Sequence, residues 1–90
     1  MIAVNVPLEM ISRCNTLGEI VPIKFKIENA AHEMLVAKVE EVIYQKESNF
    51  AGMRSFEYGC KIHLEGREQL LEISYQVAHH KWMIKKVVYG

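Results

Sequence analysis

Two runs of strict alternation between apolar and polar residues constrain the fold of this chain more than any other feature. The apolar positions are Tyr58, Cys60, Ile62 and Leu64 in the first run, and Leu71, Ile73, Tyr75 and Val77 in the second. Successive side chains of a strand point to opposite faces, so this pattern buries one face of a sheet and exposes the other. The chain is therefore predicted to be built around a one-sided antiparallel sheet.

Weaker alternation extends this prediction toward the beginning of the chain. The even-numbered residues from Ile2 to Met10 are all apolar. Pro7 lies between them and cannot donate to a strand ladder, which favours a sheet edge or a bend at that point. A turn at residues 14–18 then leads to a second predicted strand. Its inward positions are Val21, Ile23, Phe25 and Ile27.

The second half of the chain is predicted to consist of hairpins. Short polar connections at residues 65–68 and 78–81 join three strands, over residues 56–64, 70–77 and 82–88. Residues 46–53 are predicted to form a polar loop, from which Phe50 and Met53 fold back to cover the core.

Residues 29–46 fit two kinds of structure. In a helix over residues 31–46, the apolar residues follow an amphipathic stripe behind Asn29 as a cap, and the fold becomes α+β. In a strand, a bulge at Glu40-Glu41 is needed before Val42 and Tyr44 continue inward. The pattern alone slightly favours the helix. Its stripe consists of Leu35, Val36, Val39, Val42 and Ile43, whereas the strand points Leu35, Ala37 and Val39 inward.

A series of landmark residues runs in order through nearly the whole chain. They are Gly18, Pro22 and Phe25, then Val39-Glu40-Glu41-Val42-Ile43, Phe56-x-Tyr58-x-Cys60-x-Ile62 and Trp82-x-Ile84. This order resembles a family of small uncharacterised bacterial proteins, some of which are encoded beside lesion-bypass DNA polymerases. The resemblance implies a strand at residues 39–43 and carries no known activity. With it, we predict a mostly β fold, a curled antiparallel meander sheet or small half-open barrel of about six strands.

Length and charge limit the classes of function. Ninety residues make one domain, residues 1–90, with a single modest core. Eleven Lys and Arg residues balance eleven acidic ones, so no overall field attracts nucleic acid or an anionic membrane. All the acids are Glu, and the absence of Asp removes the acid of a Ser-His-Asp triad and Asp-rich calcium loops. No nucleophile, base and orienting group share one face, so the chain is not expected to be an enzyme.

The opening residues, the length of the apolar runs and the two cysteines indicate the cellular compartment. The opening residues lack a basic leader, Glu9 interrupts the first apolar stretch, and no apolar run approaches the ~18 residues of a membrane span. We therefore expect a cytoplasmic protein with no membrane partner. Cys14 and Cys60 are too few for a disulfide scaffold and are expected to be reduced there.

Cysteine and histidine residues offer the only candidate metal or nucleophile sites. Cys60 and His63 are three residues apart on a predicted strand and so face opposite sides, with Cys60 in the core. Cys14, in a turn, is the more accessible thiol. His79 and His80 are adjacent on a predicted turn, where side chains diverge, and zinc needs more ligands than they supply. No metal and no cofactor are expected.

Aromatic residues follow the inward phase and are predicted to pack in the core, which counts against base stacking on an exposed sheet. Three others, near loops or the end of the chain, are predicted to be exposed. The inward ones are Phe25, Phe56, Tyr58, Tyr75 and Trp82, and the exposed ones are Tyr44, Phe50 and Tyr89.

Four lysines form the only candidate binding strip. Lys24, Lys26 and Lys85 occupy outward positions and Lys86 is adjacent, so a sufficiently curled sheet brings them together as a surface for phosphate groups. The simpler interpretation is that they keep the sheet soluble and pair across strands with glutamates. Those glutamates are Glu28, Glu40, Glu57 and Glu72.

We expect a small non-enzymatic binding module. Its most favoured partner is another protein or a second copy of the chain, bound through an exposed edge strand near Pro7, Val87 or Val88. The alternative is a nucleic-acid-associated accessory protein that uses the lysine strip.

Overall fold

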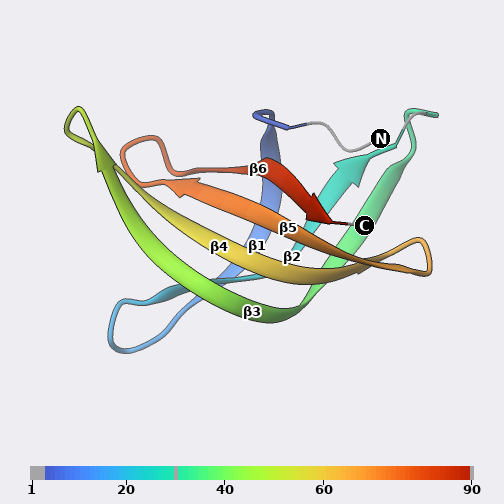
Figure 1. Cartoon of the computed structure of the whole chain (residues 1–90), viewed down its shortest axis with the longest axis horizontal. Helices are drawn as coiled ribbons and strands as arrows, with labels where there is room; N and C mark the ends of the chain where they lie inside the picture. Colours follow the sequence, from blue (N-terminus) through green and yellow to red (C-terminus); the bar gives the residue numbers. More distant parts are fainter. Residues whose placement is uncertain (1–3, 30, 90) are drawn as a thin grey trace.

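Six antiparallel strands follow one another around a ring, joined by short turns (Figure 1). The computed structural model describes residues 4–29 and 31–89, and this part of the chain contains no helix. The curled six-strand meander is therefore confirmed. Its strands are β1 (Pro7–Cys14), β2 (Ile20–Glu28), β3 (Met34–Phe50), β4 (Met53–Leu64), β5 (Arg67–Gln76) and β6 (Lys81–Tyr89).

The alternative helix at residues 31–46 is wrong, because these residues form most of β3. The ladder between β3 and β4 skips Glu40, which confirms the predicted bulge, and it skips Ile43 as well. Each extra residue shifts the alternation by one position. Two bulges three residues apart thus turn the two-residue strand period into wider spacings that imitate a helix. Because of the second bulge, Tyr44 lies outward, which confirms its predicted exposure and corrects the inward position that the strand alternative gave it.

The core fills the inside of the ring. The regular alternation of β4 and β5 points their apolar residues inward, as predicted, and all five predicted aromatic residues are buried or packed against the core. Trp82 from β6 contacts Tyr75 and Tyr58, with ring centroids 4.8 Å and 5.5 Å apart. The hydroxyl of Tyr58 donates to the carbonyl oxygen of Ile20 over 2.6 Å, linking β4 to β2. Burial raises the pKa of Tyr58 to about 12.

The β1–β2 hairpin departs from the predicted phase. Its ladder skips Ile23, so Pro22, rather than Val21, is buried at the start of β2. Leu8 and Met10 on β1 pack against the core, as predicted. Val4 and Val6 precede the strand and are exposed, and Ile2 lies outside the described residues.

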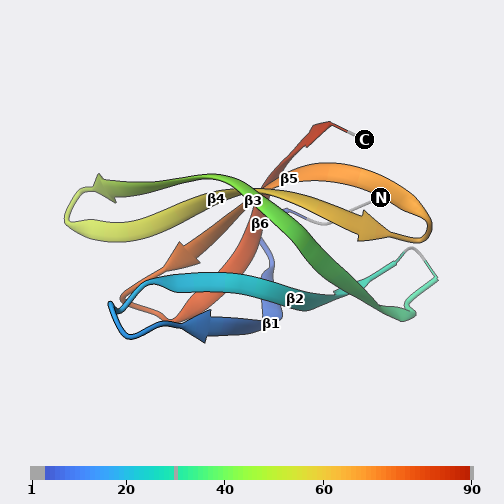
Figure 2. The same ribbon diagram turned by 90° about the horizontal axis from the view of Figure 1, so that it is seen from below.

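The ring closes through a short seam between β1 and β6. Only Pro7 and Leu8 pair with β6, opposite Met83 and Trp82, and the backbone N–H of Asn5 donates to the carbonyl oxygen of Ile84. Figure 2 shows β1 and β2 together on one side, with β3 crossing from them to the β4 side. Among the described residues, no strand pairs with residues 9–14 of β1 on the side away from β2.

The predicted polar loop at residues 46–53 is wrong. Strands β3 and β4 continue to a two-residue turn at Ala51-Gly52, whose φ angles of 53° and 81° match the twist of a tight hairpin. Phe50 and Met53 are 82% and 49% exposed, so neither covers the core, whereas the predicted exposure of Phe50 is confirmed. Glu65-Gly66 makes the same kind of turn between β4 and β5, as predicted. The loop prediction failed because this hairpin end extends beyond the core, so neither of its faces shows a clear apolar pattern.

Candidate functional site

Two carboxylates are buried on the outer face of the sheet. The side chains of Glu57 on β4 and Glu72 on β5 are 6% and 4% exposed. Glu57 pairs with Ser74 and Glu72 pairs with Gly59, so the two glutamates are diagonal neighbours on one face. Burying a charged group is costly unless it is paired and hydrogen-bonded. The partners of these two carboxylates therefore indicate whether the site stabilises the fold or is available for binding or catalysis.

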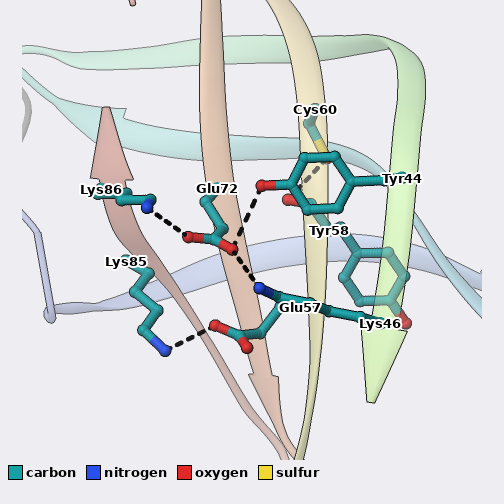
Figure 3. A network of polar contacts seen from close by, with 8 residues as sticks. All are labelled: Tyr44, Lys46, Glu57, Tyr58, Cys60, Glu72, Lys85 and Lys86. Atoms are coloured by element: carbon teal, nitrogen blue, oxygen red, sulfur yellow. Dashed lines mark hydrogen bonds and ion pairs between the residues drawn. The ribbon is translucent and has the colours of Figure 1, made fainter. Parts of the chain in front are cut away.

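Both carboxylates are held by donors from the flanking strands (Figure 3). Glu72 accepts a hydrogen bond from the Tyr44 hydroxyl over 3.3 Å, and its oxygens lie 3.7 Å and 3.5 Å from the Nζ atoms of Lys46 and Lys86. Glu57 accepts from Lys85 over 2.6 Å. We call these six residues, Tyr44, Lys46, Glu57, Glu72, Lys85 and Lys86, the glutamate cluster.

Bulges assemble the glutamate cluster. The ladder between β5 and β6 skips Lys85, so Lys85 and Lys86 both reach the outer face instead of alternating. On β3, the bulge at Ile43 sets Tyr44 opposite Gly59. A Cβ atom on Gly59 would lie 2.1 Å from the Tyr44 ring, so only glycine leaves room for this ring against the backbone.

The electrostatics of the glutamate cluster fit a structural role. Burial and the negative charge of Glu72 raise the pKa of Tyr44, and the hydrogen bond to Glu57 raises the pKa of Lys85. Among the described residues, no buried side-chain nitrogen or oxygen lacks a hydrogen-bond partner, and no group of three His, Cys, Asp or Glu residues is placed to hold a metal. The cluster joins the outer faces of four strands, β3 to β6.

The four lysines singled out in the sequence lie in two separate places. Lys85 and Lys86 belong to the glutamate cluster, which confirms their predicted pairing with Glu57 and Glu72. Lys24 and Lys26 lie on β2, on the other side of β1 from β6. The four lysines thus form two separate pairs, Lys24 with Lys26 on β2 and Lys85 with Lys86 on β6. Their contact with nucleic acid stays a prediction.

A groove of about 380 Å³ runs over β1, β2 and β3 on the outer face. Lys24 pairs across strands with Ile11 on one side and with Lys38 on the other, and neither lysine has an acidic partner among the described residues. Lys26 contacts Glu9 over 3.2 Å. We call this surface the basic groove; its lining is Glu9, Met10, Ile11, Lys24, Phe25, Lys26 and Val36.

The basic groove lies beside the unpaired edge of β1. Ile11 and Val36 are 54% and 58% exposed, although both are aliphatic. Sequence reasoning missed the groove, since Val36 belonged to the ambiguous segment and the alternation was followed only as far as Met10. The available signal was the outward phase that Ile11 shares with Glu9 and Arg13.

The cysteines and histidines lie where the sequence placed them. Cys60 is fully buried, and burial raises the pKa of its thiol to about 12, whereas Cys14 is exposed. His63 is exposed on the face opposite Cys60, and its Nδ1 lies 3.2 Å from Glu40. His79 and His80 are exposed in the last turn. Within residues 4–29 and 31–89 there is no helix that could span a membrane.

Comparison of the chain with protein-family models, with curated proteins and with solved structures found no match. The functional assignment therefore depends on the glutamate cluster, the basic groove and the edge of β1.

Proposed function

We propose that this protein is a small non-enzymatic interaction module that binds an extended protein segment as an added strand on β1. The observation that carries the proposal is the edge at residues 9–14, with which no described strand pairs on the side away from β2. An unpaired strand edge presents backbone N–H and C=O groups that pair readily with another chain. The β6 contact at Pro7 and Leu8 fixes where the added strand must stop.

The surroundings of this edge suit recognition of side chains. In strand addition, the backbone supplies affinity and neighbouring pockets select alternate side chains of the bound segment. The basic groove lies on the outer face next to the edge, with exposed Ile11 on β1 and exposed Val36 two strands away. An exposed aliphatic residue on an unpaired strand edge, such as Ile11, leaves that edge open to pairing with another chain.

Selection of random short peptides displayed on phage tests this function. Enriched peptides are expected to alternate apolar and polar residues, and their binding should slow amide hydrogen exchange at residues 9–14. Ile11→Glu should abolish binding. Met53→Glu is the matched control, because Met53 is 49% exposed but lies at the β3–β4 turn. Binding that leaves the β1 amides unprotected, or that Met53→Glu weakens as strongly, would contradict the proposal.

A nucleic-acid-associated role is the second candidate, favoured by the unneutralised pair of Lys24 and Lys38. Phosphate contacts release counterions, so binding of a labelled single-stranded or duplex DNA should weaken steeply with salt. Changing both lysines to Glu should abolish it, whereas Lys81→Glu, an exposed lysine at the start of β6, should leave it intact. Absence of DNA binding at low salt excludes this role.

A further inference from the structure

We infer that the strand added to β1 is β1 of a second copy of this chain, antiparallel and centred on Ile11. This inference rests on the proposed function, because it names the partner of the same edge. The pairing joins two rings into a two-fold symmetric dimer, in which each β1 supplies the same surface. The β1 strand is already held extended by β2, so little further ordering is needed.

The side chains of β1 complement themselves in this arrangement. Leu8 and Met10 pack inward, so the alternate residues Glu9, Ile11 and Arg13 share the outer face. Centring on Ile11 places Ile11 opposite its copy. It also places Glu9 of each chain opposite Arg13 of the other, giving two opposite-charge pairs and one apolar pair on one face.

The charges needed for this pairing are available. Arg13 is exposed and has no acidic partner among the described residues. The side chain of Glu9 is 71% exposed while it contacts Lys26, so it remains accessible to a second cation. A carboxylate can accept from two donors, and Lys26 therefore need not be displaced.

Other registers are disfavoured by charge or by space. Centring on Glu9 or on Arg13 sets like charges opposite each other. Centring on Met10 or on Ser12 sets Ile11 opposite a charged residue. The Glu9- and Met10-centred registers also require pairing at residues 7–8, where β6 already occupies the edge. The Ile11-centred register needs only residues 9–13, which lie within the unpaired edge.

Sedimentation equilibrium of the whole protein tests the inference. Five pairs of residues make a small interface, so a dimer with a Kd on the order of tens of micromolar is expected, visible between about 5 and 500 µM. Glu9→Arg and Arg13→Glu should each weaken the dimer at least about tenfold, because each creates two like-charge pairs. The double variant Glu9→Arg/Arg13→Glu restores opposite charges and should return Kd to within about threefold of the original.

Two controls make the result decisive. Both substituted residues are exposed, so circular dichroism should show an unchanged fold, and Glu41→Arg, an exposed change on β3, should leave the dimer intact. A dimer that responds to neither single variant, or that the double variant does not restore, overturns the Ile11-centred register. A protein that stays monomeric overturns the dimer itself. In that case, selected peptides that protect β1 still support strand addition, so the two proposals fail separately.

Discussion

The glutamate cluster and the basic groove both contain glutamate and lysine side chains on the outer surface, yet their glutamates differ in burial. Glu57 and Glu72 are almost fully buried beneath lysines and Tyr44, whereas the side chain of Glu9 is 71% exposed. The buried glutamates have paired strands on both sides, and bulges bring extra side chains over them. Glu9 lies on a strand that is paired along its length on only one side.

This difference shows that an outward strand position does not by itself mean exposure to solvent. Where two flanking strands and a bulge place side chains over them, outward carboxylates become buried. They are then held by ion pairs and hydrogen bonds that link neighbouring strands in one register. Where one flank is missing, the same residue types stay accessible and keep their pairing capacity for a partner. The following predictions test the contrast, from the largest expected effect on stability to the smallest.

The largest effect is expected for truncation of a buried apolar side chain, and almost none for the same change at the exposed β1 edge. Ile84→Ala removes a fully buried side chain from β6 and should lower the free energy of unfolding by about 3 kcal/mol, through lost transfer energy and a cavity. Ile11→Ala on the exposed edge should change it by less than about 0.5 kcal/mol. Urea titration of dilute protein measures both, and similar losses would show that the β1 edge is part of the core.

The next largest effect separates the two kinds of glutamate. Glu72→Ala removes the acceptor of Tyr44, Lys46 and Lys86 and should cost about 2 kcal/mol, the range of hydrogen bonds to charged groups. The stranded lysines are more than half exposed and can be hydrated, which keeps the loss from being larger. Glu9→Ala should cost less than about 0.5 kcal/mol. Equal losses of unfolding free energy in urea titration would remove the distinction between the glutamate cluster and the basic groove.

A smaller effect is expected at the contact between Gly59 and Tyr44. Gly59→Ala forces the Tyr44 ring off the backbone and should cost about 1 kcal/mol. In Tyr44→Ala the ring is absent, so adding Gly59→Ala should then cost nothing or stabilise the strand slightly. A double-mutant cycle measures this coupling, and additive losses would show that the ring does not depend on the glycine.

The smallest effect on the free energy of unfolding at neutral pH is expected from ionisation of the buried Cys60 thiol. Folding raises the pKa of Cys60 from 9.0 to about 12, so its contribution is fully present below pH 9.0 and is lost as pH rises toward 12. Tyr44 and Tyr58 act in the same direction above pH 10.0. Urea midpoints should therefore be flat near neutrality and fall from about pH 9. In Cys60→Ala the fall should begin about one pH unit later, and an unchanged onset would contradict this assignment.

The sequence was most informative where one register runs without interruption. Strands β4 and β5 keep one phase over their paired length, so Cys60, Ile73 and Tyr75 were placed correctly from alternation alone. The resemblance, not the pattern, favoured the strand at β3. Its two bulges had erased the two-residue period, and only one of them, at Glu40, was anticipated.

The candidate sites were less predictable, because they depend on contacts between strands. The burial of Glu72 requires donors from β3 and β6, and it depends on the bulge at Lys85, which alternation does not reveal. Lys24 on β2 is separated from Lys86 on β6 because β1 lies between these two strands in the ring, which alternation does not reveal either. The pairing of lysines with Glu57 and Glu72 was foreseen as the simpler interpretation, since outward lysines and glutamates on neighbouring strands attract one another.

The two-residue seam between β1 and β6 also bears on how the chain folds. Strands β3 to β6 are joined by tight turns, so their hairpins close short loops and can form early. Pairing Leu8 with Trp82 closes almost the entire chain into one loop, which costs entropy and returns only two residue pairs. The folding transition state is thus expected to contain the hairpins with the seam still open. Substitutions at the seam should then speed unfolding while leaving the folding rate nearly unchanged.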